Sequence, residues 1–285
     1  MQYINASSAQ EALDALLQAD GSGVIVAGGT DLMVDYKAGK VKNSVWIDVT
    51  RASDLVGIQV EDGKLVIGAA TTLTTIARSP LVRQYFPSLA QGCGTVGSLQ
   101  IRNSATLVGN VVSAQPAGDG AMSLAPLDPT FTVLSAQGER TMSMGEMYAG
   151  FARSAVDHSR ELVTKLSIPL PQPGEAASFI RLELRKSLSL PMLNCAAMVH
   201  VEGGKIVWAR ITMAPVGVGP VRAAAAERYL AGKEMSDEVL AQAGQLALEN
   251  ANPRSNPLRG SREYRLETLP VLIRRALEEC RTQLV

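Results

Sequence analysis

The chain has 285 residues, of which 46% are apolar and 19% charged, and this balance excludes an intrinsically disordered protein. The 27 basic and 27 acidic side chains cancel, so net charge gives no reason to expect binding to nucleic acid or to an anionic membrane. The length predicts two domains, each large enough for its own core.

Targeting and metal-binding signals are absent from the sequence. It opens without a basic segment followed by an apolar run, and it has no stretch of about 18 apolar residues, so we expect a cytoplasmic protein that does not span a membrane. Cys93, Cys195 and Cys280 lie far apart and form no CxxC pair, which argues against a disulfide framework, a zinc site or an iron–sulfur ligand set. With only two histidines, we expect no metal site on this chain.

The first half of the chain predicts strands and helices in alternation. A capping box at residues 8–11 precedes a helix with an apolar face, and the strand GVIVA then ends at Gly28-Gly29. SVWIDV is a second strand, and LVGIQVEDGKLVIGAA predicts a hairpin with Asp62-Gly63 as its turn. Next come a helical pattern in TTLTTIARSPLVRQY, a hairpin in FTVLSAQGERTMSM and a strand in ELVTKLSIPL.

A proline-rich segment marks the boundary between the two predicted domains. Pro169, Pro171 and Pro173 supply no amide donors and stiffen the chain, so we expect domains at 1–170 and 176–285. Beyond this boundary the pattern predicts three strands, the last two joined at Gly203-Gly204, and then three helices. The sequence therefore indicates an α+β protein whose C-terminal domain has a three-stranded antiparallel sheet covered by helices.

The turn in VIVAGGTDLMVDYK is a candidate anion site. Glycines let a backbone approach a ligand closely, and amides exposed at such a turn favour phosphate. The alternative is an ordinary turn between a strand and a helix. The spacing is neither GxGxxG nor GxxxxGK[ST], so it does not fit the common dinucleotide or P-loop motifs.

The stretch TVGSLQIRNSATLVGNVVSAQPAGDG, residues 95–120, is polar but carries only two charged side chains, Arg102 and Asp119. Its hydroxyls and amides could satisfy phosphate oxygens, and Asp119 could accept hydrogen bonds from sugar hydroxyls. Long loops in compact domains are usually functional, although a tight structural crossover is the alternative. Two phosphate-capable turns in one domain are what a cofactor with a diphosphate bridge requires.

These segments together resemble a known family. AGGTDL, followed by QIRNSATLVGN and SAQPAGD, is similar to the FAD-binding subunit of the molybdenum hydroxylases, the family of xanthine dehydrogenase and carbon monoxide dehydrogenase. RKSLSLPMLNCAAMV, ITMAPVGVGPVRAAAAERYLAGK and NPRSNPLRGSREYRLETLPVLIRRAL resemble the C-terminal flavoprotein domain of that family. The resemblance covers nearly the whole chain, with its segments in the same order.

The resemblance implies a fold and a set of cofactor-binding residues. The N-terminal region is expected to be a FAD domain of the vanillyl-alcohol-oxidase, or PCMH, type. One turn would bind the diphosphate of FAD from one side and a second turn from the other, Asp119 would lie near the adenosine portion, and Arg181 or Lys186 could approach the isoalloxazine. The first turn comprises Ala27, Gly28, Gly29, Thr30 and Asp31, and the second comprises Thr106, Gly109 and Asn110.

The resemblance also implies partners. In this family [2Fe-2S] clusters take electrons from a molybdopterin centre and transfer them to FAD. FAD passes them to NAD⁺, oxygen or another acceptor. This chain lacks cysteines in cluster spacing, so the clusters and the molybdopterin are expected on an iron–sulfur subunit and a molybdopterin subunit, in a dimer of heterotrimers.

Two positions depart from the family pattern. Val108 stands where the family has glycine, so either the backbone there is ordinary β or FAD is held more weakly, and Gln115 stands where serine is frequent. Val108 supports one alternative, a flavin-free subunit for assembly or docking. A stand-alone flavin oxidoreductase is the other. The substrate of the complex and the terminal acceptor stay open.

Overall fold

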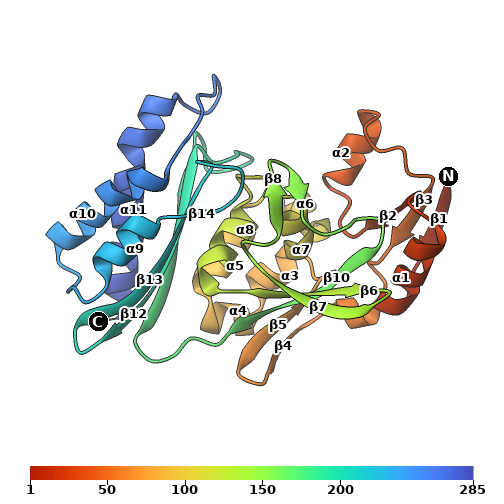
Figure 1. Cartoon of the computed structure of the whole chain (residues 1–285), viewed down its shortest axis with the longest axis horizontal. Helices are drawn as coiled ribbons and strands as arrows, with labels where there is room; N and C mark the ends of the chain where they lie inside the picture. Colours follow the sequence, from red (N-terminus) through yellow and green to blue (C-terminus); the bar gives the residue numbers. More distant parts are fainter. Residues whose placement is uncertain (285) are drawn as a thin grey trace.

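A small parallel sheet begins the chain in the computed structural model, which describes residues 1–284 (Figure 1). Its strands are β1 (Gln2–Asn5), β2 (Gly23–Val26) and β3 (Val45–Asp48), in the order β1-β3-β2. Helix α1 (Ala9–Gln18) packs on this sheet and buries Ala12 and Leu16 against Ile47. Strand β1 was not among the predicted elements.

The predicted capping box begins α1, with one difference. The Ser8 side chain accepts a hydrogen bond from the Glu11 amide at 3.2 Å, as a capping residue does. The Glu11 carboxylate accepts from the amide of Ser7 at 2.8 Å, one residue earlier than the pattern predicts. Beyond β2 the chain turns at residues 27–31 into the short helix α2 (Leu32–Lys37).

A five-stranded antiparallel sheet follows, in the order β4-β5-β10-β6-β7. Both predicted hairpins are confirmed within it, and Asp62 and Gly63 turn the first with φ of 48° and 71°. A separate two-stranded hairpin, β8–β9, lies between β7 and β10. The strands are β4 (Ile58–Glu61), β5 (Lys64–Gly68), β6 (Thr130–Ser135), β7 (Gly138–Ser143), β8 (Tyr148–Gly150), β9 (Arg153–Ser154) and β10 (Glu161–Pro169).

A run of short helices joins β5 to β6 and packs on this sheet around Phe86, Leu89 and Phe131. Residues 95–120, which the sequence suggested to be a ligand-binding loop or a crossover, form parts of four of these helices. Side chains of Ser98 and Thr106 cap two of them. The helices are α3 (Leu73–Arg78), α4 (Pro80–Tyr85), α5 (Pro87–Thr95), α6 (Leu99–Ser104), α7 (Leu107–Val112) and α8 (Asp119–Leu124), with 3-10 turns at Ser53–Leu55 and Ala125–Leu127.

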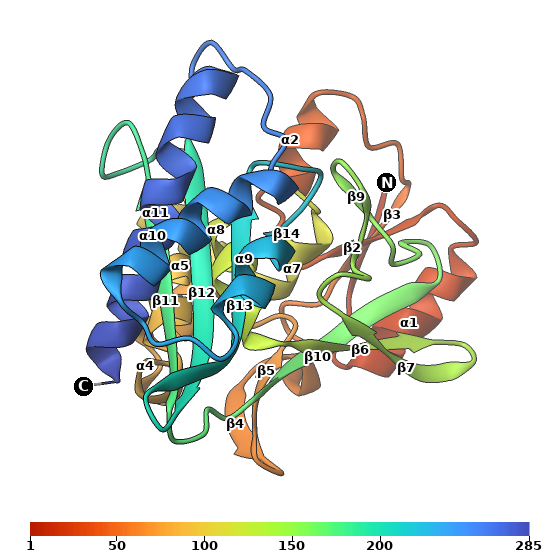
Figure 2. The same ribbon diagram turned by 60° about the vertical axis from the view of Figure 1, so that its left-hand side comes forward.

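The C-terminal part is an antiparallel sheet covered on one face by helices (Figure 2). The sheet has four strands within the described residues, so the prediction of three was wrong. The additional strand, β14, has only two residues and lies beside the end of β13, a length that leaves no pattern in the sequence. The strands are β11 (Glu175–Leu182), β12 (Leu193–Glu202), β13 (Lys205–Ala214) and β14 (Val221–Arg222).

The predicted C-terminal helices are confirmed as α9 (Ala224–Leu230), α10 (Asp237–Leu246) and α11 (Arg262–Gln283), with a 3-10 turn at Ala247–Asn250. They bury one face of the sheet in a second large core. The opposite face meets α8, where Met122 packs among Phe179, Ala196 and Ala214. The two parts of the chain therefore share an apolar contact. No helix in residues 1–284 is long and apolar enough to cross a membrane.

Candidate functional site

One large cavity lies between the two parts of the chain. Its volume is about 1340 Å³, which exceeds the roughly 300–1,000 Å³ of ordinary small-molecule pockets and suits a dinucleotide. Helix α2 and the connection that precedes α11 both contribute to it, and both segments lie along the upper side of the molecule in the two views (Figures 1 and 2). The cavity brings together nine of the eleven predicted cofactor residues: Ala27, Gly28, Gly29, Thr30, Asp31, Thr106, Gly109, Asn110 and Asp119.

The turn after β2 offers unused amide donors to this cavity. The backbone amides of residues 28–32 donate to no backbone carbonyl within residues 1–284. Gly29 has φ of +65°, a conformation that glycine adopts without strain. A Cβ on Gly28 would lie 2.3 Å from the carbonyl oxygen of Ser104, so the turn lies directly against the backbone between α6 and α7.

Asp31 adds a carboxylate to the same turn. It does not cap α2 with its side chain. Burial, and after it the negative charge of Asp35, raise the pKa of Asp31 above its usual value. An anion bound at the turn would favour the neutral form of this acid still further.

The second predicted turn uses its polar side chains internally. Thr106 is 3% exposed, and its hydroxyl oxygen accepts from the amide of Gly109 at 3.0 Å as the cap of α7. The side-chain oxygen of Asn110 accepts from the amide of Ala121 at 3.0 Å, which ties α7 to α8. These two side chains hold the wall of the cavity in place. Gly109, in the first turn of α7, lines the cavity without a side chain that would project into it.

Val108 lies within α7, so of the two alternatives for this position the ordinary β backbone was wrong: the backbone is helical. It is 5% exposed and packs in the core under the sheet, and its φ is not positive. A valine fits a helical backbone without strain. The backbone conformation of Val108 therefore gives no reason to expect weaker cofactor binding.

Asp119 belongs to a buried polar network that joins the two parts of the chain. One carboxylate oxygen lies 3.0 Å from the Nε of Arg181 on β11, and the other accepts from the side-chain amide of Asn194 on β12 at 2.9 Å. Burial raises the pKa of Asp119, and the Arg181 charge and the hydrogen bonds oppose that rise. Arg181 also contacts the side chain of Glu183 and the carbonyl of Ser189.

The two remaining predicted residues do not line the cavity. Arg181 is buried behind Asp119, and its partners are protein groups. Lys186 is exposed in the connection between β11 and β12, whereas Ser189 and Leu190 of that connection do reach the cavity. The structure thus brings neither predicted cation to the cavity surface.

Sequence reasoning missed the part of the cavity built by the segment before α11. Arg254, Arg259 and Arg265 line it there, and Phe151 at the tip of the β8–β9 hairpin lines it beside Arg254. Their sequence signal was a segment rich in arginine, NPRSNPLRGSREYR, which contains a single acidic residue. That signal does not indicate which surface the arginines face.

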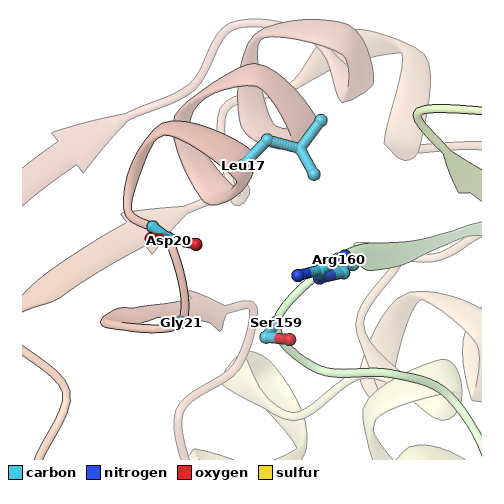
Figure 3. A pocket seen from close by; sticks show the side chains of 5 residues that line it. All are labelled: Leu17, Asp20, Gly21, Ser159 and Arg160. Carbon is cyan, nitrogen blue, oxygen red and sulfur yellow. The ribbon is translucent and has the colours of Figure 1, made fainter.

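A second, smaller cavity of about 350 Å³ lies between the end of α1 and the turn before β10. Figure 3 shows Asp20 and Gly21 on one side and Ser159 and Arg160 on the other, with Leu17 above. Its volume lies at the lower end of ordinary small-molecule pockets and is too small for a dinucleotide.

Comparisons with known proteins match this architecture. Residues 1–171 match the family model described as the FAD binding domain in molybdopterin dehydrogenase, and residues 179–280 match the CO dehydrogenase flavoprotein C-terminal domain. The nicotinate dehydrogenase FAD-subunit of Eubacterium barkeri is 32% identical over 76% of this chain and 74% of that protein. The putative xanthine dehydrogenase FAD-binding subunit of Escherichia coli K12 is 24% identical over 97% of this chain and 94% of that protein.

Solved structures agree over the full length. A chain of carbon monoxide dehydrogenase from Hydrogenophaga pseudoflava superposes with a TM-score of 0.94 at 25% identity, covering 100% of this chain and 98% of that one. Quinoline 2-oxidoreductase from Pseudomonas putida 86 gives a TM-score of 0.92 at 27% identity, with the same coverage. The chain thus belongs to the family of FAD-binding subunits of molybdopterin dehydrogenases, with an N-terminal FAD-binding domain and a C-terminal flavoprotein domain.

Proposed function

We propose that FAD binds in the large cavity and that the chain serves as the electron-transferring FAD subunit of a molybdenum hydroxylase. The observation that carries this proposal is the single cavity of about 1340 Å³ that both glycine-bearing segments line. The amides of residues 28–32 have no backbone acceptor within residues 1–284 and are suited to the oxygens of a diphosphate. The donors and the volume fit the cofactor.

The residues divide into those that contact FAD and those that position them. Gly28, Gly29 and Thr30 bind the diphosphate through their amides, and Gly109 lets it approach the wall of α7. Thr106 and Asn110 hold α7 and α8 in place. Asp119 contributes at the cavity edge while Arg181 fixes its carboxylate, and the approach of Lys186 to the isoalloxazine stays a prediction.

FAD, when bound, supplies the capacity to accept two electrons and return them to an acceptor. The protein supplies position, exclusion of water and electrostatics. Relatives are named as FAD subunits of nicotinate and xanthine dehydrogenases. We infer an iron–sulfur subunit and a molybdopterin subunit as partners, in a dimer of heterotrimers, with NAD⁺ among the acceptors, in the cytoplasm.

The fold assignment completes the proposal. We infer that residues 1–170 form a PCMH-type FAD domain and residues 176–285 the C-terminal flavoprotein domain. The proline-rich connection between β10 and β11 supports this boundary. The helical backbone at Val108 weakens the case for a flavin-free docking subunit, because that backbone needs no glycine.

The test is a titration of the purified full chain with FAD, followed by absorbance and flavin fluorescence. We expect one FAD per chain, with changed absorbance bands, and release of intact FAD on denaturation. A chain that takes up no FAD, alone or with its partner subunits, would contradict the proposal and leave a docking role. Co-purification with molybdenum and iron–sulfur subunits separates a complex from a stand-alone oxidoreductase.

A further inference from the structure

Three arginines converge on the wall of the cavity that the C-terminal part contributes. Arg254, Arg259 and Arg265 come from one segment, the connection after α10 and the first turn of α11, and all three line the cavity. None of the three forms an ion pair within residues 1–284, in contrast to the arginines at positions 140, 181, 210, 222, 274 and 281. Three like charges without a carboxylate repel one another unless an anion joins them.

Arg265 is the buried member of this cluster. Its side chain is 3% exposed, and its guanidinium donates only to the carbonyl of Arg259, at 3.2 and 3.4 Å, and to the carbonyl of Pro215, at 3.4 Å. These are long bonds to neutral acceptors. Burial, and then the charges of Arg259 and Arg254, lower the pKa of Arg265, although a guanidinium keeps its charge in proteins. A buried charge without a counterion is costly, which indicates a missing anion.

Two local hydrogen bonds hold the backbone around the cluster. The side chain of Asn256 accepts from the amide of Leu258 at 2.9 Å, and the hydroxyl of Ser255 accepts from the amide of Arg262 at 2.9 Å. The Arg254 guanidinium lies over the ring of Phe151 at 4.8 Å. Phe151 belongs to the N-terminal part, so this cation–π contact joins Arg254 of the C-terminal part to the N-terminal part at the cavity.

The acidic side chains in the cavity do not neutralise the cluster. Asp35, Asp119 and Glu161 each have a cationic partner elsewhere, namely Lys40 at 2.9 Å, Arg181 at 3.0 Å and Arg140 at 2.8 Å. Asp31 alone among the acids that line the cavity has no such partner within residues 1–284. The unpaired charges around the cavity are therefore three positive and one negative.

From this arrangement we propose that Arg254, Arg259 and Arg265 form a second phosphate site, which binds a phosphate group of a nucleotide from the wall that the C-terminal part contributes. Arginine forks bind phosphate oxygens in pairs, and a fixed cluster loses little side-chain freedom on binding. This inference rests on the proposed function, which supplies the nucleotide. The phosphate group can come from two sources. One is the diphosphate of FAD, and the other is a dinucleotide acceptor such as NAD⁺.

The experiment compares Arg254→Gln and Arg259→Gln with Arg262→Gln, a change in the same segment at an exposed residue that does not line the cavity. Arg265 is left intact because its loss risks misfolding. FAD is titrated into the apo full chain, and NAD⁺ is titrated into the FAD-loaded chain by calorimetry. If the cluster binds FAD, the two cavity variants bind FAD about 10- to 100-fold more weakly and with a shallower salt dependence.

If the cluster binds the acceptor, FAD affinity stays within about twofold and NAD⁺ affinity falls about 10-fold or more. If FAD and NAD⁺ bind to the two cavity variants as tightly as to Arg262→Gln, the proposal is overturned. A wild-type chain that binds no FAD would instead count against the proposed function. Inorganic diphosphate then decides the inference: binding that the Arg254→Gln/Arg259→Gln double variant loses supports the cluster, and no such binding overturns it.

Discussion

The turn after β2 and the turn that opens α7 line the same cavity, but they use their polar groups differently. The first leaves the amides of residues 28–32 without backbone partners. In the second, two polar side chains are already used inside the protein: the Thr106 hydroxyl accepts from the Gly109 amide, and the Asn110 oxygen accepts from the Ala121 amide. Composition alone made both turns candidates for binding phosphate. The difference teaches that a polar side chain in a turn is available to a ligand only where no group of the protein already uses it.

The largest expected effect concerns Asp119 and its buried network, which lie next to the second turn. Asn110 holds α8, and α8 begins at Asp119, whose carboxylate faces Arg181. Asp119→Ala removes one of the two carboxylates that pair with the buried Arg181, and also the acceptor of the Asn194 side chain, so the free energy of unfolding should fall by about 3 kcal/mol. Chemical denaturation measures it. Asp237→Asn, at an exposed ion pair with Arg281, is the control and should cost no more than about 1 kcal/mol. Equal losses would show that the network does not join the two parts.

The first turn should be sensitive to added volume. A Cβ at Gly28 meets backbone atoms of Ser104 and Ala105 at 2.3 and 2.6 Å, so Gly28→Ala forces the turn away from α6 and α7. We expect FAD affinity to fall by about 10- to 100-fold, in line with the roughly 1–3 kcal/mol cost of overpacking. Fluorescence titration measures it. Gly145→Ala, where a Cβ has open space, should bind FAD normally, and equal affinity of both variants would disprove the close approach.

A cap mutation separates positioning from binding in the second turn. Thr106→Ala removes the acceptor for the Gly109 amide and should lower stability by about 1 kcal/mol, whereas Thr106→Ser should retain most of it. Thermal unfolding with and without FAD provides the measurement. If Thr106 only positions α7, both forms of the protein lose the same amount. A loss confined to the FAD-loaded form would assign the hydroxyl to the ligand.

The smallest effect tests the charge at the first turn. The pKa of Asp31 is raised in the folded chain, and a bound diphosphate raises it further, so FAD affinity should be greatest at low pH and decline as pH rises through that raised pKa. Above it, Asp31→Asn should bind FAD about 2- to 5-fold more tightly than wild type, with a flatter pH profile. Titrations at several pH values test this. Identical profiles would place the carboxylate away from the diphosphate.

Local patterns predicted much of the fold. Alternation and the Asp62-Gly63 turn defined a hairpin, and the capping serine defined α1. Helices α6 and α7 have six residues each, too few to display a helical period, so residues 95–120 suggested a loop. Strand β14 was missed for the same reason.

The candidate site was predictable only in part. The glycine turn has a local signature, and the polar but charge-poor composition of residues 95–120 indicated the segment of Thr106 to Asp119, to which the family resemblance then gave roles. The arginine wall depends on how the segment before α11 folds over the cavity, which no spacing within that segment encodes. Asp119 matched a cofactor position, yet its pairing with Arg181 arises only when the two parts pack together.

The contact of Gly28 with the Ser104 backbone affects the order in which the chain folds and binds its cofactor. Two segments far apart along the chain must meet before the floor of the cavity exists, and the arginine wall requires the C-terminal part as well. A fragment that ends before Ser104 lacks the floor of the cavity. FAD binding would therefore come late in folding. The fraction of chains with flavin absorbance would report how many had brought the Gly28 turn and the Ser104 backbone together.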